Sequence, residues 1–123
     1  MFIIIGAVFS FLSVLFGAFG AHALEKILDE KSLSWWHTAT QYLSTHALAL
    51  ILIGLWLERN SKRKANFAAY SFIVGIFLFS GSLYALALSG WKILGIITPF
   101  GGLAFMLGWL SFAYAAFRQQ LKA

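Results

Sequence analysis

Any chemistry in this sequence depends on a few polar side chains that lie inside long apolar stretches. Tyr42 and His46 are four residues apart in one such stretch, and Gln41 stands next to them. An ionisable ring inside an apolar span marks a functional pocket by default, which suggests ligand binding or proton transfer. Packed helices also use such side chains for interhelical hydrogen bonds. Both interpretations stay open for His46.

A second histidine lies near the end of the apolar, glycine-rich segment GAFGAHAL, residues 17–24. On a straight helix, His22 lies nearly opposite the small residues of its own segment. We therefore expect His22 to cap the outer end of a helix by donating to loop carbonyls or to a lipid phosphate. This structural role is favoured over a functional one.

The residues around these histidines do not match a known pattern for metal or covalent chemistry. His22 and Glu25 could share a helix face, but one such pair lacks the repeated Glu-x-x-His of a di-iron bundle. No carboxylate lies inside an apolar span, so a serine beside His46 would form an unoriented dyad. The chain has no cysteine, which excludes thiol chemistry. We therefore expect no catalytic residues, no metal site and no cofactor.

The elements that must position these side chains are long and apolar. The chain is 61% hydrophobic and 11% charged, whereas soluble domains average about 45–50% and about 25%. Runs of about 20 apolar residues predict helices that cross a hydrocarbon layer about 30 Å thick. Four spans are predicted, at about residues 2–24, 35–57, 67–89 and 93–117. The first lacks a charged n-region and a cleavage site, so we expect it to be retained.

Most connections between the predicted spans are short, so neighbouring helices must run antiparallel. This predicts an all-α, up-down-up-down four-helix bundle in a single transmembrane domain, residues 1–123. The longest connection, residues 24–37, has the helical spacing of a short interfacial turn. We expect Ser34 to cap the second span and Trp35 and Trp36 to join an aromatic belt.

The distribution of basic residues predicts the orientation in the membrane. Six of the nine lysines and arginines lie in the segment 58–64 or in the C-terminal tail. The other side has three lysines, diluted by acidic residues. Because cytoplasmic flanks are rich in Lys and Arg, both termini should be cytoplasmic. The net charge of +5 therefore reflects topology, and no nucleic-acid-binding patch is expected.

Small residues recur at helical spacing and predict the surfaces where helices pack. Such residues let helix backbones approach closely inside a membrane. The predicted faces are Gly6, Ser10, Ser13, Gly17 and Gly20 in the first span, Ala68, Ser71, Gly75, Ser82 and Ser89 in the third, and Gly101, Gly108 and Ala115 in the fourth.

The fourth span contains Pro99, which has no amide hydrogen, so the helix either kinks there or begins afresh. On the second span, the residues Thr38, Gln41, Tyr42, Thr45, His46 and Ala49 fall within an arc of about 140°, which we expect to face into the bundle. With the predicted orientation, polar side chains concentrate in the outer half of the membrane. These form a candidate ligand-binding pocket of His22, Gln41, Tyr42, His46, Ser80, Ser82, Tyr84 and Thr98.

Four motifs together resemble a known family. They are GAFGAHAL, the pair Tyr42 and His46, FSGSLYALAL at residues 79–88, and TPFGG at residues 98–102 followed by Gly108-Trp109. The sequence is similar over nearly its whole length to small four-helix membrane proteins described as domain of unknown function 423, whose eukaryotic branch is transmembrane protein 256. The resemblance implies a multi-pass protein of the bacterial cytoplasmic membrane. It implies no chemistry.

Three functions remain open. The first is a non-enzymatic binding or accessory role, with the polar pocket holding a lipid, a small ligand or a partner helix. The second is transport of protons or small solutes, which needs a homo-oligomer joined through the small-residue faces because four helices are too few to enclose a pathway. The third, least favoured, is a lipid-modifying enzyme with His46 as its base. Membrane lipids are the expected partners in every case.

Overall fold

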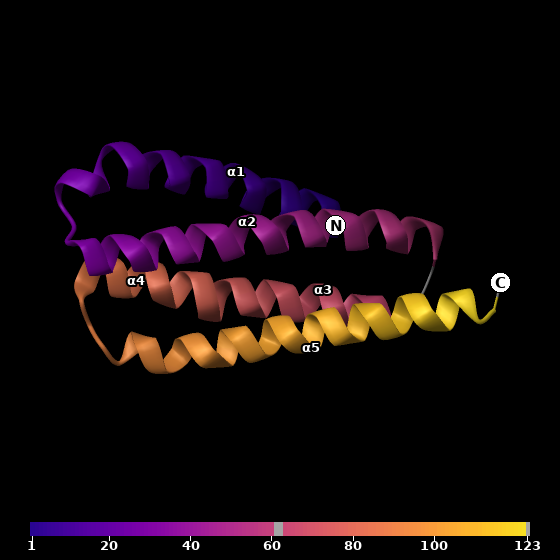
Figure 1. Ribbon diagram of the computed structural model, residues 1–123. Coiled ribbons are helices and arrows are strands. Elements are labelled where there is room, and N and C mark those ends of the chain that lie inside the picture. The colour runs from indigo at the N-terminus through magenta and orange to yellow at the C-terminus, as the bar shows by residue number, and fades with distance from the viewer. Residues whose placement is uncertain (61–62, 123) are drawn as a thin grey trace.

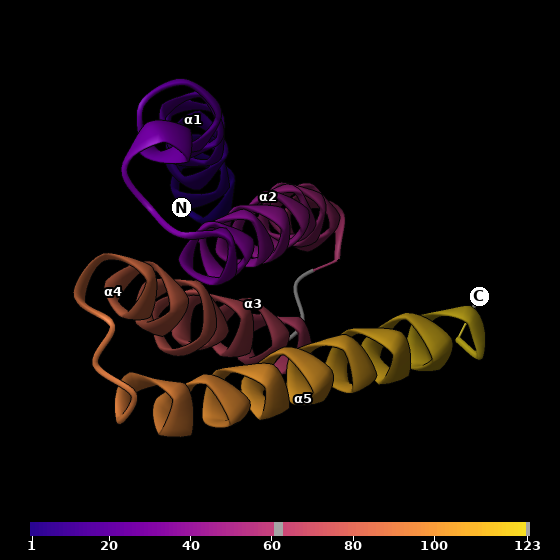
Figure 2. The same ribbon diagram turned by 60° about the vertical axis from the view of Figure 1, so that its left-hand side comes forward.

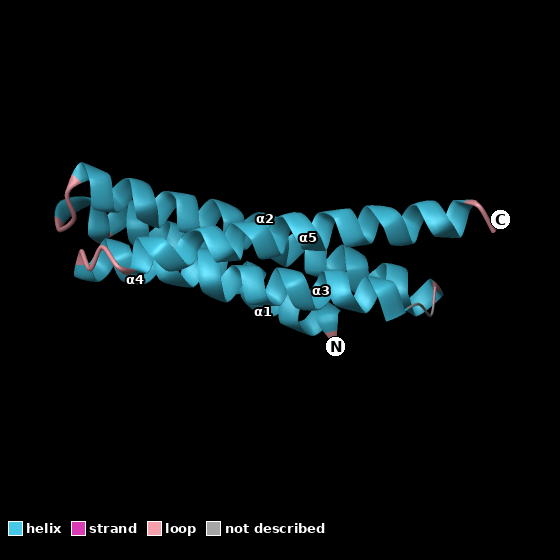
Figure 3. Ribbon diagram, turned by 90° about the horizontal axis from the view of Figure 1, so that it is seen from below, coloured by secondary structure: helices cyan, strands magenta, loops and turns pink. Residues whose placement is uncertain are grey.

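The computed structural model describes residues 1–60 and 63–122, and in them it is helical apart from short connections (Figure 3). The elements are α1 (Phe2–His22), η1 (Leu24–Lys26), α2 (Glu30–Arg59), α3 (Arg63–Gly75), η2 (Ile76–Gly81), α4 (Ser82–Ser89) and α5 (Leu94–Gln120). Because α3, η2 and α4 follow one another without a break, they form one long helix. Among the described residues, four helices are thus long and apolar enough to cross a membrane, as predicted.

Helix α2 begins earlier than the apolar pattern predicts. Asp29 caps it, with its carboxylate accepting a 2.7 Å hydrogen bond from the backbone N–H of Ser32. The prediction that Ser34 caps this helix is therefore wrong, because the helix starts in the polar connection before its apolar stretch. At the other end of the molecule, α4 stops at Gly90, whose φ of +68° is left-handed and suits glycine.

Pro99 lies within the second turn of α5, which continues from Leu94 to Gln120. The alternative in which the helix begins afresh at Pro99 is therefore wrong. Thr98, directly before the proline, directs its hydroxyl back to the carbonyl of Leu94 at 3.3 Å.

The third long helix contains a π-helical segment, η2, at Ile76–Gly81. In such a segment the backbone bonds run from residue i to residue i+5, so each residue is rotated relative to its place in a regular α-helix. This segment packs against both α2 and α5. The segment therefore determines whether a polar side chain of the third helix faces α2 or α5.

Successive long helices run in opposite directions, and the two termini lie toward the end where α2 connects to α3 (Figure 1). Viewed more nearly along the helices, α1 and α5 lie at opposite edges with α2 and the α3–α4 helix between them (Figure 2). The apolar windows of α1 and α5 are correspondingly less buried than those of the two middle helices. The core thus lies around α2 and the α3–α4 helix.

Small residues set the closest helix contacts, as predicted. On α1, a Cβ added to Gly6 would lie 2.7 Å from the Ala47 carbonyl, and one added to Gly20 would lie 2.6 Å from the Trp36 ring. On α5, Gly101 meets the backbone of Phe79, and Gly108 meets the Phe72 ring. The predicted faces on α1 and α5 are therefore packing surfaces inside this one chain. On the third helix Ala68, Gly75 and Ser82 are also buried and Ser71 is half-buried, but Ser89 is exposed, so the predicted face does not extend that far.

Candidate functional site

His46 lies at the centre of a cluster of polar and aromatic contacts between α2, the third helix and α5. Its Nδ1 is 2.8 Å from the backbone carbonyl of Tyr42, and its Nε2 is 3.1 Å from the indole Nε1 of Trp109. A carbonyl oxygen can only accept, and an indole N–H can only donate. The ring is therefore a neutral imidazole with its proton on Nδ1, and both nitrogens are engaged.

Aromatic rings enclose the imidazole on the remaining sides. Its ring stacks on Phe105 with centroids 3.5 Å apart and planes 9° apart, and Phe72 contacts it edge-on at 5.1 Å. Only 3% of His46 is exposed. His46 is therefore an ionisable residue in an apolar environment, and both of its ring nitrogens have hydrogen-bond partners within the protein.

A groove of about 290 Å³ lies beside this ring, between α2, η2 and α5. It is open at its sides, because Tyr42, Met106 and Trp109 are 39%, 59% and 43% exposed. Its lining consists of Tyr42, His46, Phe79, Gly102, Phe105, Met106 and Trp109. The groove thus presents aromatic and thioether groups, with His46 at its base.

Tyr84 belongs to a different cluster, on the side of α1. Its hydroxyl is 2.8 Å from the hydroxyl of Thr40, which is 3.0 Å from the Trp36 carbonyl. The Trp36 indole donates to the carbonyl of Phe16 at 2.8 Å, and its ring lies 4.5 Å from that of Tyr84. These contacts join α1, α2 and α4 at the end of the molecule that carries η1.

The serines of the third helix bond to two different neighbours. Ser80 is buried and donates to the carbonyl of Ala39 on α2 at 2.8 Å. Ser82 lies 2.7 Å from the hydroxyl of Thr98 on α5 and 3.0 Å from its own helix carbonyl at Phe79. Each serine therefore closes an interhelical hydrogen bond.

The remaining two candidate residues stand apart from these clusters. His22 is exposed in the last turn of α1, and Gln41 is exposed on the outer side of α2. The expectation that the whole polar arc of the second span faces into the bundle is wrong, because Gln41, Tyr42 and Thr45 are exposed whereas His46 and Ala49 are buried. The arc straddles the edge of the helix contact.

The structure therefore does not gather the eight candidate residues into one cavity. Tyr42 and His46 line one groove, while Ser80 and Tyr84 line a separate apolar one of about 140 Å³ beside α1. Four further residues were not among the candidates: Phe105 and Trp109 in the cluster around His46, and Trp36 and Thr40 in the cluster around Tyr84. A tryptophan in the middle of a span is a signal that could have identified Trp109, because an indole N–H in lipid needs an acceptor.

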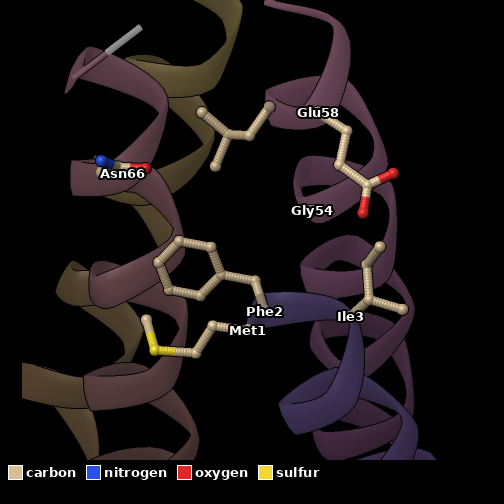
Figure 4. A pocket seen from close by; sticks show the side chains of 7 residues that line it. Met1, Phe2, Ile3, Gly54, Glu58 and Asn66 are labelled. Carbon is tan, nitrogen blue, oxygen red and sulfur yellow. The ribbon is translucent and has the colours of Figure 1, made fainter. Parts of the chain in front are cut away.

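A further cleft of about 270 Å³ lies where α1 begins, between α2 and α3. Figure 4 shows Phe2 projecting from the start of α1, with Glu58 and Asn66 on opposite walls. Gly54 makes this approach possible, because a Cβ there would lie 2.9 Å from the Ile3 backbone nitrogen. In the described part of the chain, no three His, Cys, Asp or Glu side chains are grouped as metal ligands.

The architecture and its apolar helices define a small polytopic membrane protein. The family of proteins of unknown function DUF423 matches residues 16–102, and the chain belongs to that family. It is a multi-pass bacterial membrane protein, which confirms the class and location implied by the four sequence motifs.

Relatives of similar length share much of the sequence. The chain is 45% identical to the UPF0382 membrane protein SH2409 of Staphylococcus haemolyticus, over 96% of each protein. It is 44% identical to UPF0382 membrane protein YwdK of Bacillus subtilis, over 94% of this chain and 95% of the relative. A UPF0382 membrane protein of Haemophilus influenzae is 42% identical over 93% and 91%. No solved structure matches.

Proposed function

We propose that this protein is a non-enzymatic binding protein that holds the apolar chain of a membrane lipid or isoprenoid in the groove beside His46. The observation that carries the proposal is the groove itself, in which Tyr42, Phe79, Phe105, Met106 and Trp109 surround a fully bonded imidazole. Aromatic rings and methionine make adaptable contacts with hydrocarbon.

The size of the groove supports a chain rather than a whole lipid. Its volume of about 290 Å³ is near the lower limit of about 300 Å³ for small-molecule sites. A single acyl or prenyl segment entering from the bilayer fits an opening of this kind better than a bulky headgroup does. The rest of the molecule would remain among neighbouring lipids.

An enzymatic role has weaker support than binding. A general base must have a free lone pair within reach of the proton it removes, and Trp109 donates to the lone pair of His46. Ser80 and Ser82 donate to the backbone carbonyls of Ala39 and Phe79 and do not bond to His46.

A transport role also has weaker support. The small-residue faces that could have joined several copies around a pathway are used within the chain, where Gly6, Gly20, Gly101 and Gly108 meet neighbouring helices. An oligomer would therefore have to form through other surfaces.

The proposal includes an orientation in which helices alternate up and down and both termini are cytoplasmic. The groove beside His46 then opens near the middle of the bilayer, and the Tyr84 cluster lies toward the outer surface. The clustering of basic residues near the α2–α3 connection and the C-terminus supports this orientation.

Photo-crosslinking tests the binding proposal. Membranes containing a diazirine-labelled fatty-acyl phospholipid are irradiated, and labelled peptides are mapped by mass spectrometry. We expect labelling to concentrate on the α5 segment 102–109. Gly102→Leu should reduce this labelling severalfold, because a Cβ at Gly102 has only the Phe79 ring nearby, at 3.8 Å, and the side chain can enter the groove.

The matched control is Gly95→Leu, at an exposed glycine of the same helix outside the groove. It should leave the labelling unchanged. Equal labelling of all lipid-exposed helix faces, or labelling of residues 102–109 that Gly102→Leu does not reduce, would reject a specific groove.

A further inference from the structure

The outer face of α2 is polar over the half of its length nearest η1. Its polar residues fall within an arc of about 120° and are exposed or half-buried. We call them the polar face of α2: Ser34, His37, Thr38, Gln41, Ser44 and Thr45. Farther along, the same arc continues as the exposed side chains of Leu48, Leu52 and Leu55.

The inner part of this polar face, from Gln41 to Thr45, lies at the depth of the hydrocarbon. Thr40 is level with Gly17 of α1, since its methyl carbon is 3.6 Å from where a Cβ on Gly17 would stand. Gly17 is five residues, or about 8 Å, inside the end of α1 at His22. Taking the end of α1 as the edge of the hydrocarbon puts Gln41 about 8 Å inside it and Thr45 about 6 Å deeper.

Most of these polar groups lack a partner within the part of the chain that the structure describes. Thr45 donates to its own helix carbonyl at Gln41, at 3.0 Å. The side chains of Gln41, His37 and Ser44 make no hydrogen bond to other described residues. Lipid tails cannot satisfy an exposed amide or hydroxyl, so a monomer would leave these groups unsatisfied.

We infer that the polar face of α2 is a homodimer interface, with a second copy of this chain as its occupant. Two copies with the same membrane orientation are related by a two-fold axis parallel to the membrane normal. Each residue on the face then meets its own counterpart at the same depth. Polar residues meet polar residues, and Leu48, Leu52 and Leu55 meet leucines.

The side chains on this face are suited to pairing with themselves. The amide of Gln41 both donates and accepts, so two copies form reciprocal hydrogen bonds, and the hydroxyls of Thr38 and Ser44 can do the same. These three residues are uncharged, so placing each one next to its own copy brings no like charges together. A second copy of the same face can therefore supply the hydrogen-bond partners that this face needs.

The flank of α1 permits a second copy to approach closely. The phenylalanine side of α1 faces the third helix, where Phe9 contacts Phe77 and Phe16 contacts Tyr84. The opposite side, beside the polar face of α2, exposes Ala7, Ala18 and Ala21 together with the short branched side chain of Val14. Small side chains at that place let helices of two copies come together. The groove beside His46 borders this polar face on the side of α5, where Tyr42 lines it.

Cysteine crosslinking in native membranes tests the dimer, and the natural chain contains no cysteine that would interfere. Leu48→Cys places a thiol on the inferred interface, at a side chain that is 55% exposed. Leu110→Cys is the matched control, 69% exposed on α5, and it is next to Trp109, which bonds to His46 near the same depth. A short bis-maleimide should crosslink the Leu48→Cys protein to itself and leave the Leu110→Cys protein monomeric.

The contribution of Gln41 is measured by energy transfer between labelled copies as they are diluted in liposomes. Gln41→Leu should weaken the dimer about sevenfold, which corresponds to about 1.2 kcal/mol for two reciprocal bonds at the average membrane value. Tyr70→Phe, an exposed hydroxyl on α3, is the control and should leave dimerisation unchanged. A monomer at all lipid dilutions, crosslinking to a different protein, stronger crosslinking through Leu110→Cys, or a dimer unaffected by Gln41→Leu would overturn the inference.

Lipid labelling of the groove does not depend on the dimer. Failure of the dimer test would therefore leave the binding proposal intact, and failure of the lipid test would leave the interface intact.

Discussion

His46 is an ionisable residue that the protein keeps neutral by geometry. The Tyr42 carbonyl holds the Nδ1 proton, and the Trp109 indole occupies the Nε2 lone pair. A charged imidazolium could not accept from Trp109, so the bond depends on the neutral ring. This residue therefore links α2 to α5 and forms the base of the groove.

Removing one partner of this bond should cost more than removing both. Trp109→Phe leaves a buried Nε2 without a donor and should destabilise the protein by about 1–2 kcal/mol. In the Trp109→Phe/His46→Phe double variant neither polar group remains, and at least about 0.6 kcal/mol of that loss should be recovered. Unfolding free energies measured by SDS titration in mixed micelles report both values.

Trp91→Phe controls for the loss of an indole, because Trp91 is exposed in the α4–α5 connection. Its stability should stay at the wild-type value. If the loss of stability in the double variant equals the sum of the losses in the Trp109→Phe and His46→Phe single variants, the two side chains do not interact.

At the scale of elements, the start of α2 depends on an exposed carboxylate. The backbone N–H of Ser32 bonds to Asp29 and lowers the pKa of this carboxylate below its ordinary value. The ionised cap contributes fully above the ordinary pKa of 3.8, and its contribution is lost as the pH falls through the lowered pKa of the folded protein.

We therefore expect the first turn of α2 to fray only in strong acid. Hydrogen exchange at the backbone of Ser32 should become less protected as the pH falls below about 4, after correction for the intrinsic exchange rate. Asp29→Asn keeps a capping side chain that does not titrate, so its protection should not depend on pH in this range. The same pH dependence in Asp29→Asn would assign the effect to another group.

Two neighbouring glycines of α5 should respond in opposite ways to the same substitution. A Cβ at Gly101 would collide with the backbone of the third helix, with the Leu78 carbonyl carbon and the Phe79 Cα both at 2.7 Å. Backbone cannot move aside cheaply, so Gly101→Ala should cost about 1–3 kcal/mol. Gly102→Ala meets only the Phe79 ring, at 3.8 Å, and should be neutral or stabilising because alanine favours helix.

SDS titration of the two variants gives this comparison directly. Equal effects of the two substitutions would show that the α5 contact with the third helix is not as close as described.

The sequence predicted the long elements well because their signal is local. Apolar length located the four spans, and small residues at helical spacing located the contacts at Gly6, Gly20 and Gly108. The start of α2 after its cap Asp29 was missed because the apolar pattern marks only the part of the helix that lies inside the bilayer, and the helix extends beyond that part. The π-helical segment η2 has no residue pattern that distinguishes it from an α-helix.

At the scale of the whole molecule, the candidate site was only partly predictable. Helical periodicity places Gln41 and His46 on one arc, but it does not tell which edge of the arc a neighbour covers. Here α5 covers His46 through Phe105 and Trp109, and Gln41 stays outside. Likewise Tyr84 on α4 meets Thr40 on α2, away from the groove that α5 lines.

The orientation of the whole molecule gives a final prediction. Both termini and the α2–α3 connection lie toward one end (Figure 1), and six of the nine basic residues lie in that connection or the C-terminal tail. Cysteines introduced singly at Glu25 and Ser89 should react with a membrane-impermeant maleimide in intact cells. Cysteines at Asn60 and Gln120 should react only after the membrane is permeabilised.

Neutralising Arg59, Lys62, Arg63 and Lys64 together provides the causal test, since the bias in Lys and Arg sets orientation. A fraction of the molecules should then invert, so that Asn60→Cys becomes reactive in intact cells. Reactivity of Asn60→Cys and Gln120→Cys from outside in the otherwise natural protein would reverse the orientation and place the Tyr84 cluster toward the cytoplasm.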